Sequence, residues 1–263
     1  MAGRAPDPAL VAYIAGELAR PTLPEAYAFG AALAERRGVV AVLFYGSCLQ
    51  RGTTEGMLDF YVLTEGARPY GQSALISALG RALPPNVYPE TFSGLKAKAA
   101  VVSANAFQAR MAADILDTTF WARFCQRAAL VWARDDAARD QAATAVAAAV
   151  ETGAVWASRL APDLDGAQAW RALFARTYKI EIRVEPPSRA ADIVGAEEAR
   201  WEEVWRLSAP ARRADHGGSG GWWLKWWAGK GLHLSRLAKA ALTFEGGPRY
   251  LVWKIRRHLR RRP

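Results

Sequence analysis

The chain has 263 residues and a formal net charge of +10. Its apolar fraction of 51% suffices for a packed core and excludes a wholly disordered chain. Two cysteines, Cys48 and Cys125, are too few for a disulfide framework or a cysteine-rich metal site, and they favour a reducing compartment. The sequence contains no apolar run of the about 20 residues that a membrane-spanning helix needs, and we expect neither a secretory signal nor a transit peptide.

The predicted elements follow a simple order. Helical patterns over about 7–19 and 25–37 precede two apolar, strand-like runs, "VVAVLFYG" at 39–46 and "MLDFYVLT" at 57–64. Two further strands are predicted at 86–92 and 98–104, on either side of a turn at Ser93-Gly94. Helices are then predicted from about residue 106 onward, most clearly over 137–160, 168–183 and 195–207. The glycine-rich residues 216–221 read as a flexible joint.

This order predicts an α+β protein with a small mixed sheet and flanking helices, followed by a helical region and a basic amphipathic tail. We expect a sheet-containing domain at 1–135, a helical domain at 136–215, and the joint with its tail at 216–263. Residues 222–263 hold eleven lysines and arginines against one acid, whereas residues 1–221 hold 24 of each sign. The excess positive charge therefore belongs to the tail and not to the whole surface.

The first predicted strand ends at Gly46-Ser47, and Asp59 follows twelve residues later on the second strand. Glycine permits a tight turn and the close approach of a phosphate, which backbone N–H groups and the Ser47 hydroxyl can bind. Mg²⁺ characteristically takes one or two carboxylates together with substrate phosphates, so Asp59 suits such an ion. These features fit nucleotidyl transfer, but they fit an exposed aspartate on an ordinary strand pair equally well.

The segments "FYGS" and "MLDFYV" resemble the nucleotidyltransferase superfamily of DNA polymerase beta. Within it the chain is most similar to the mitochondrial Tam-type phosphatidate cytidylyltransferases (CDP-diacylglycerol synthases) and their bacterial relatives. The similarity continues in order and spacing through "NVYPETF", "LKAKAAVVS", "FWARFCQRAALVW" and "LFARTYKIEIRV", over residues 38–135 and 170–205. The resemblance implies magnesium as cofactor and CTP as the nucleotide substrate.

The resemblance also implies a role for each matching residue. Asp59 is expected to be the catalytic metal ligand. The expected nucleotide-binding residues are Gly46, Ser47, Lys98, Ser103 and Arg123, and Tyr178 and Arg183 are expected to face the cleft. Arg123 is separated from Gln126 by one residue more than in the family, which weakens its match.

Polymerase-like enzymes of this superfamily carry Asp-x-Asp, but Tyr61 occupies the second position here. The resembling subfamily also lacks a carboxylate at this position. Glu90 on the third predicted strand is the favoured second metal ligand, and Glu55 in the loop is the other candidate. A single-metal site and a pseudoenzyme are both left open.

The tail combines tryptophan with positive charge. Its expected membrane-binding residues are Trp222, Trp223, Trp226, Trp227, Arg256, Arg257 and Arg260. Tryptophan prefers the membrane–water interface, and each basic residue near an anionic surface contributes about 1 kcal/mol of binding. Packing of the tail against its own domain or a dimer partner is the main alternative, and nonspecific binding of nucleic acid is less favoured.

Taken together, the sequence favours a cytidylyltransferase that uses CTP and phosphatidate, or a related anionic lipid phosphate. We expect it to be cytoplasmic, peripheral on the inner face of the membrane, with homodimerisation left open. Two alternatives remain: a nucleotidyltransferase with a non-lipid acceptor, and a non-catalytic membrane-peripheral protein on the same scaffold.

Overall fold

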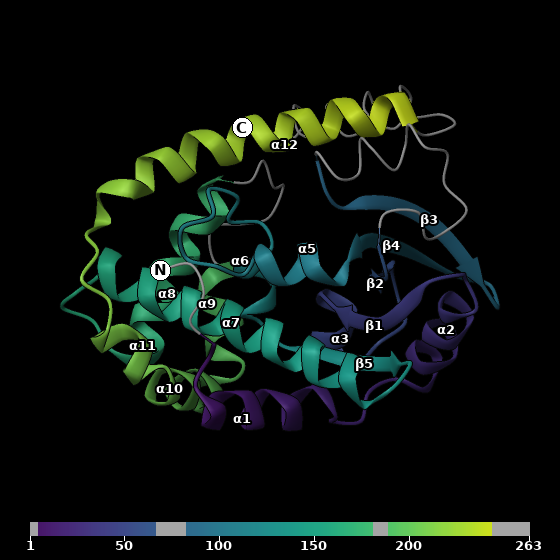
Figure 1. Ribbon diagram of the computed structural model, residues 1–263, viewed down its shortest axis with the longest axis horizontal. Helices are drawn as coiled ribbons and strands as arrows, with labels where there is room; N and C mark the ends of the chain where they lie inside the picture. The colour runs from purple at the N-terminus through teal and green to yellow at the C-terminus, as the bar shows by residue number, and fades with distance from the viewer. Residues whose placement is uncertain (1–4, 67–82, 181–188, 244–263) are drawn as a thin grey trace.

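A computed structural model describes residues 5–66, 83–180 and 189–243. It confirms the α+β class, with a five-stranded mixed sheet at one end of the molecule and a helical part at the other (Figure 1). The strands are β1 (Val39–Tyr45), β2 (Leu58–Thr64), β3 (Asn86–Phe92), β4 (Leu95–Ser103) and β5 (Ala128–Ala133). Their order is β3-β4-β2-β1-β5, with β2 and β4 parallel and the other neighbours antiparallel.

The sequence predicts only four of these strands. The fifth, β5, is the apolar run "AALVWA" within a region whose overall pattern is helical. Strand β5 pairs with β1. Strand β1 is buried along almost its whole length and therefore carries apolar residues at consecutive positions, not at every second position. A six-residue apolar run of this kind does not reveal by periodicity whether it forms a strand or a buried helix.

The helices cover both faces of the sheet and form the helical part. They are α1 (Pro8–Leu18), α2 (Pro24–Ala34), α3 (Ser47–Arg51), α5 (Ala104–Ala109), α6 (Trp121–Phe124), α7 (Asp136–Leu160), α8 (Gly166–Ile180), α9 (Arg189–Gly195), α10 (Glu198–Leu207), α11 (Ala209–Arg213), the 3₁₀ turn η1 (Ser219–Gly221) and α12 (Trp222–Thr243). Helix α7 begins where the Asp135 carboxylate accepts a hydrogen bond from the Ala138 N–H at 2.8 Å.

The sheet separates two apolar layers. On one face, Phe44 and Phe60 of neighbouring strands pack with Phe29 of α2. On the other face, Tyr61 packs with Phe124 of α6 and with neighbouring aromatic rings. Burying one such large side chain contributes about 2 kcal/mol. The second layer continues into α7, α8 and α10, so the apolar core is continuous across residue 135.

A buried ion pair joins the start of the chain to the helical part. Glu17 of α1 and Arg200 of α10 are 3% and 5% exposed, and Arg200 Nε donates to the Glu17 carboxylate at 2.8 Å. Arg200 also donates to the Cys125 carbonyl at 3.1 Å. Each charged group therefore has partners, as the low dielectric of the interior requires.

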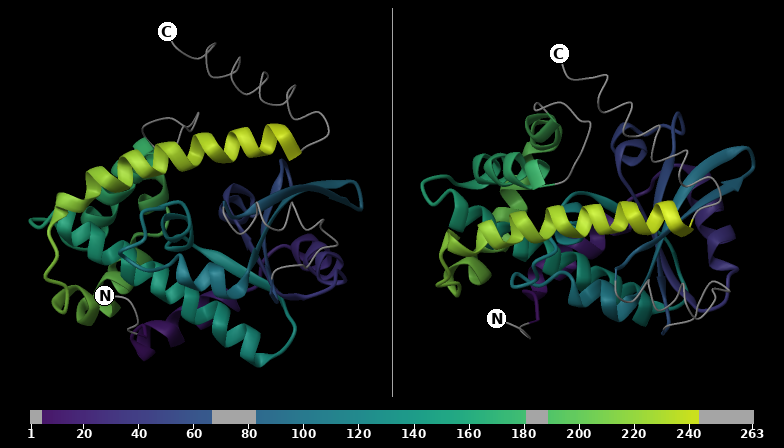
Figure 2. Two further views of the ribbon diagram at one scale, coloured as in Figure 1. Left: turned by 45° about the horizontal axis from the view of Figure 1, so that its top comes forward. Right: turned by 90° about the horizontal axis from the view of Figure 1, so that it is seen from above.

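Helix α12 lies along the length of the molecule in all views, from the helical part to the sheet (Figures 1 and 2). Trp222 packs on Trp156 of α7 at 5.4 Å between ring centroids, and a Cβ at Gly229 would meet Ile180 of α8. The first half of the predicted tail is therefore docked on the body of the protein. Among the described residues, no helix combines the length and apolarity needed to span a bilayer.

Candidate active site

The turn after β1 and the aspartate of β2 lie in contact. Tyr45, the last residue of β1, pairs with Asp59, and Gly46 follows with φ 88° and ψ −162°. A Cβ added at Gly46 would lie 2.9 Å from Oδ2 of Asp59. This backbone conformation and this close approach both require glycine. The juxtaposition of the Gly-Ser turn with Asp59, expected from sequence, is therefore present, and α3 begins directly at Ser47.

Asp59 belongs to a row of side chains that crosses the sheet on one face. In register, the row consists of Tyr45, Asp59, Lys98 and Pro89 on β1, β2, β4 and β3. Asp59 is half-buried and Lys98 is exposed. Directly opposed residues of neighbouring strands point to the same side, so the carboxylate and the ammonium share one face. The structure thus brings Gly46, Asp59 and Lys98 together.

Arg123 reaches the same face from α6. Its guanidinium carbon lies 5.5 Å from the centre of the Tyr45 ring, and Nη1 donates to the Tyr61 hydroxyl at 3.1 Å. Burial raises the pKa of Tyr61, and this effect exceeds the opposite influence of Arg123. The phenol therefore stays protonated and serves to orient Arg123, not as a base. The row thus has a cation on either side of Asp59, Lys98 from β4 and Arg123 from α6.

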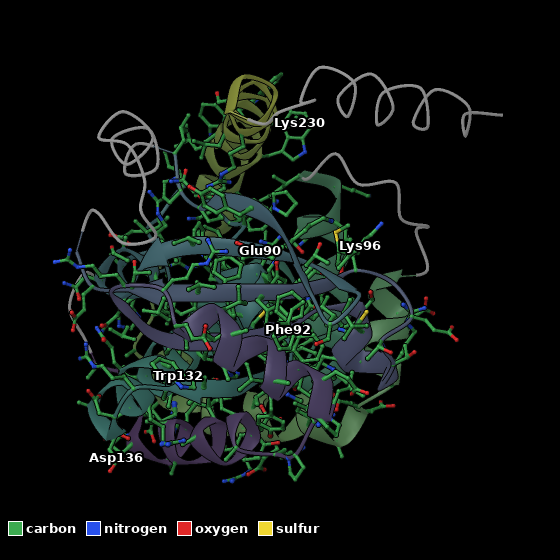
Figure 3. The ribbon with its side chains drawn as sticks, turned by 90° about the vertical axis from the view of Figure 1, so that its right-hand side faces the viewer. Glu90, Phe92, Lys96, Trp132, Asp136 and Lys230 are labelled. Carbon is green, nitrogen blue, oxygen red and sulfur yellow. The ribbon has the colours of Figure 1, made fainter. Side chains whose placement is uncertain are left out.

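Glu90 is a correction to the sequence prediction, because it lies on the other face of the sheet. It pairs with Ala97, whose side chain belongs to the apolar layer of Phe29 and Phe60. Its carboxylate accepts a hydrogen bond from Arg36 at 2.8 Å (Figure 3 labels Glu90). Asp59 and Glu90 therefore do not form a paired metal site.

Glu55, the other candidate ligand, lies in the loop before β2. Its backbone carbonyl contacts the Cys48 sulfur at 3.9 Å, which places this part of the loop beside α3. The residue itself is exposed. Its backbone is therefore close to the start of α3.

Ser103 is a second correction, because it lies at the opposite end of the sheet. It pairs with Thr64 and is five residues from Lys98 along β4, about 16 Å at the usual rise of a strand. Its hydroxyl accepts a hydrogen bond from the Ala106 N–H at 3.2 Å and caps α5. It also lines a polar cavity of about 300 Å³ with Thr64, Glu65 and Arg134. Its role is therefore that of a helix cap remote from Asp59.

The remaining predicted residues are distributed as follows. Tyr178 is half-buried on α8, which packs mainly on α7, α9, α10 and α12 and not on the strands of the site. Arg183, Arg256, Arg257 and Arg260 lie outside the described residues. Of the four tryptophans expected to bind the membrane, Trp223 and Trp227 are 61% and 62% exposed, while Trp222 and Trp226 are half-buried.

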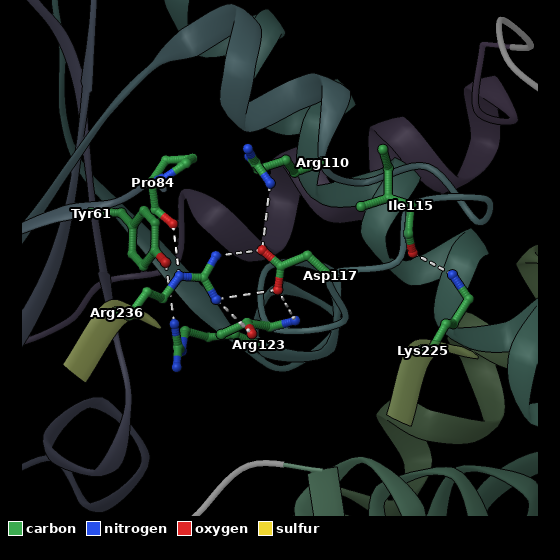
Figure 4. A network of polar contacts seen from close by, with 9 residues as sticks. Tyr61, Pro84, Arg110, Ile115, Asp117, Arg123, Lys225 and Arg236 are labelled. Carbon is green, nitrogen blue, oxygen red and sulfur yellow. Dashed lines mark hydrogen bonds and ion pairs between the residues drawn. The ribbon is translucent and has the colours of Figure 1, made fainter. Parts of the chain in front are cut away.

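A polar network that the sequence does not predict surrounds Asp117, in the segment between α5 and α6 (Figure 4). This carboxylate is 1% exposed and binds Arg236 of α12 and Arg110, the residue that follows α5. Burial alone would raise the pKa of Asp117, but hydrogen bonds from Arg236 and Thr119 outweigh it and lower the pKa. Residues 117 and 236 are far apart in the chain, so no local sequence pattern predicts a contact between them.

The residues at the site fit a divalent cation held by one protein carboxylate. In the part of the chain that the structure describes, no three His, Cys, Asp or Glu side chains gather as a metal cluster. Asp59 would therefore share the ion with phosphate oxygens and water, as Mg²⁺ commonly does. Because Gly46 has no side chain, the carboxylate of Asp59 has space beside the turn.

Comparisons with known proteins add little. No family model matches the chain, and no curated protein matches it. Among solved structures, it is similar to a nucleotidyltransferase-like protein from Exiguobacterium sibiricum, at 12% identity and a TM-score of 0.30, over 90% of this chain and 79% of that chain.

Proposed function

We propose that the chain is a magnesium-dependent nucleotidyltransferase. The observation that carries the proposal is the contact between Gly46 and Asp59, with Lys98 in register on the next strand. A carboxylate that faces a glycine turn and has a cation on each side suits a metal–triphosphate group. It offers one ligand to the ion and two positive charges to the phosphates.

Each side chain would have a distinct task. Asp59 would hold the cation, which when bound supplies neutralisation of the charge that develops on the phosphates. Lys98 and Arg123 would bind phosphate oxygens from the two sides, with Tyr45 and Tyr61 fixing the orientation of Arg123. A phosphate acceptor is already ionised at neutral pH, so positioning and electrostatic stabilisation would provide most of the rate enhancement.

We further propose a lipid phosphate as acceptor, with CTP as donor and phosphatidate as the first acceptor to test. The faces of α12 support a membrane surface. Lys225 is 2% exposed and faces inward, whereas Trp223 and Leu224 are 61% and 46% exposed and face outward. A soluble surface helix normally shows the reverse arrangement. Tryptophans one turn apart suit the membrane interface, and the basic residues of 249–262 suit anionic lipid. The protein would then be peripheral on the cytoplasmic face of the membrane.

Pyrophosphate release tests this function. The full chain is incubated with Mg²⁺, each of the four ribonucleoside triphosphates, and vesicles with or without phosphatidate. We expect release with CTP and phosphatidate, and a loss of at least about 100-fold in Asp59→Asn. Glu90→Gln is the matched control, because it neutralises a carboxylate on the opposite face of the sheet.

The outcomes separate the proposed nucleotidyltransferase activity from the proposed lipid acceptor. Release with another nucleotide or a soluble phosphate acceptor would retain the transferase and reject the lipid substrate. No release with any nucleotide or acceptor, or equal activity of Asp59→Asn and the unsubstituted chain, would reject the transferase. Vesicle binding without turnover would instead favour the non-catalytic membrane protein.

A further inference from the structure

The helix that carries Arg123 is too short to hold its own position. Helix α6 consists of four residues, Trp121–Phe124, and a single helical turn is not stable by itself in water. Its buried aromatic side chains anchor it on the sheet. Its start is fixed by Asp117, whose Oδ1 accepts a hydrogen bond from the Thr119 N–H at 3.1 Å. The geometry of Arg123 therefore depends on how Asp117 is held.

Asp117 is held by a residue far away in the sequence. Arg236 of α12 binds both oxygens of the Asp117 carboxylate and donates to the Thr119 hydroxyl at 3.1 Å. Its Nε donates to the Pro84 carbonyl at 2.9 Å, just before β3 (Figure 4). The guanidinium thus joins α12, the start of α6 and the start of β3 at one point. Arg110 adds a longer contact to Asp117, at 3.4 Å.

These contacts form a continuous path to the candidate site. Arg236 fixes Asp117, Asp117 fixes the start of α6, and α6 carries Arg123. Arg123 then lies over Tyr45, which is directly opposite Asp59. If Arg236 is lost, Asp117 stays buried with Thr119 as a hydrogen-bond partner and with only the longer contact to Arg110 as an ion pair. A buried charge in that state rearranges or draws in water.

We propose that Arg236 is a positioning residue of the nucleotide site, and that α12 is part of this site and not a detachable tail. The inference rests on the proposed function, because Arg236 acts through Arg123 on a bound nucleotide. Its guanidinium nitrogens are engaged with Asp117, Thr119 and Pro84, so it orients the site without touching substrate.

The test measures the binding of CTP and Mg²⁺ to the full chain by calorimetry, in the absence of lipid. Arg236→Gln is expected to raise the Kd about tenfold, the scale of one lost charge-assisted hydrogen bond. Lys230→Gln is the matched control: it removes the same charge from the same helix, where Lys230 lies over Trp226 and not in the network. We expect no change of Kd in this control.

A double-mutant cycle with Arg123→Gln distinguishes positioning from a general loss of stability. If Arg236 acts through Arg123, adding Arg236→Gln to Arg123→Gln raises the Kd less than twofold further, because the shared contact is already lost. A full additional tenfold loss would overturn the inference. So would an unchanged Kd in Arg236→Gln alone.

Arg236→Lys keeps the proposal testable if Arg236→Gln fails to fold. Lysine retains the charge but cannot bind two partners as a planar fork, so we expect an intermediate Kd, between the Kd of the unsubstituted chain and that of Arg123→Gln. A Kd equal to that of the unsubstituted chain would contradict the proposed role. If the unsubstituted chain binds no nucleotide, the proposed function itself fails, and this inference fails with it; nucleotide binding that is indifferent to Arg236 rejects the inference alone.

Discussion

Replacing Gly46 by alanine tests the geometry of the site most sharply. Gly46 has φ 88° and ψ −162°, a backbone conformation that only glycine adopts readily, and the new Cβ would lie 2.9 Å from Oδ2 of Asp59. The backbone strain costs about 2 kcal/mol. The contact must in addition be relieved by moving the carboxylate, so we expect activity to fall much more than stability does.

Gly52→Ala is the matched control. Gly52 also has positive φ, 61°, but a Cβ there would meet nothing within 4 Å. It should cost about 1 kcal/mol of unfolding free energy and leave activity intact. The measurements are urea unfolding at constant m-value and the initial rate of pyrophosphate release. If both variants retain the same activity, the carboxylate at position 59 does not depend on the glycine turn, and the reasoning is refuted.

Three further predictions concern α12 and the core. Burial lowers the pKa of Lys225 in the folded state from 10.5 to about 8. Between pH 8 and pH 10.5 the unfolded chain therefore binds a proton at Lys225 that the folded chain does not bind, so the free energy of unfolding should rise with pH in that window. Urea unfolding of the unsubstituted chain and Lys225→Met should show this rise only in the former; equal slopes would contradict it. Trp223→Ala and Trp227→Ala should each weaken sedimentation with anionic vesicles about tenfold, at unchanged Tm; binding that is insensitive to both would remove these rings from the membrane interface. Glu17→Gln should cost about 3 kcal/mol in urea unfolding because Arg200 is then buried without its counter-charge, and a loss below 1 kcal/mol would show that water replaces the partner.

The contact between Gly46 and Asp59 could be predicted from sequence because its determinants are local. A strand that ends in glycine and a second strand that begins a short loop later pair as neighbours, and the loop length limits their register. The carboxylate then lies beside the turn. The second cation, Arg123, was expected only from the family resemblance, because it comes from a one-turn helix whose placement depends on tertiary contacts.

The prediction of Glu90 failed for a reason that was visible in the strand. Tyr88, Glu90 and Phe92 alternate with the exposed Val87, Pro89 and Thr91. A carboxylate that shares its face with two aromatic residues faces the apolar layer, and the period of two residues carries this information. The pairing of β3 with β4 and of β4 with β2 decides whether Glu90 and Asp59 lie on the same face of the sheet, and the sequence of a single strand does not reveal this pairing.

The sequence does not predict the buried contacts of α12 for a different reason. The sequence predicts a basic amphipathic tail, and the described part of this tail forms helix α12. Arg236 and Lys225 look like residues of a solvated face, yet they bind Asp117 and the Ile115 carbonyl. The buried acceptors lie more than a hundred positions earlier in the chain, so only the fold brings them opposite the helix.

The central claim is that Asp59 binds a divalent cation together with a nucleotide. Mn²⁺ is a paramagnetic substitute for Mg²⁺, and electron paramagnetic resonance reports its bound fraction in the presence of CTP. We predict that the unsubstituted chain and Glu90→Gln bind Mn²⁺–CTP and that Asp59→Asn does not. Equal binding by Asp59→Asn, or loss of binding in Glu90→Gln alone, would contradict the claim.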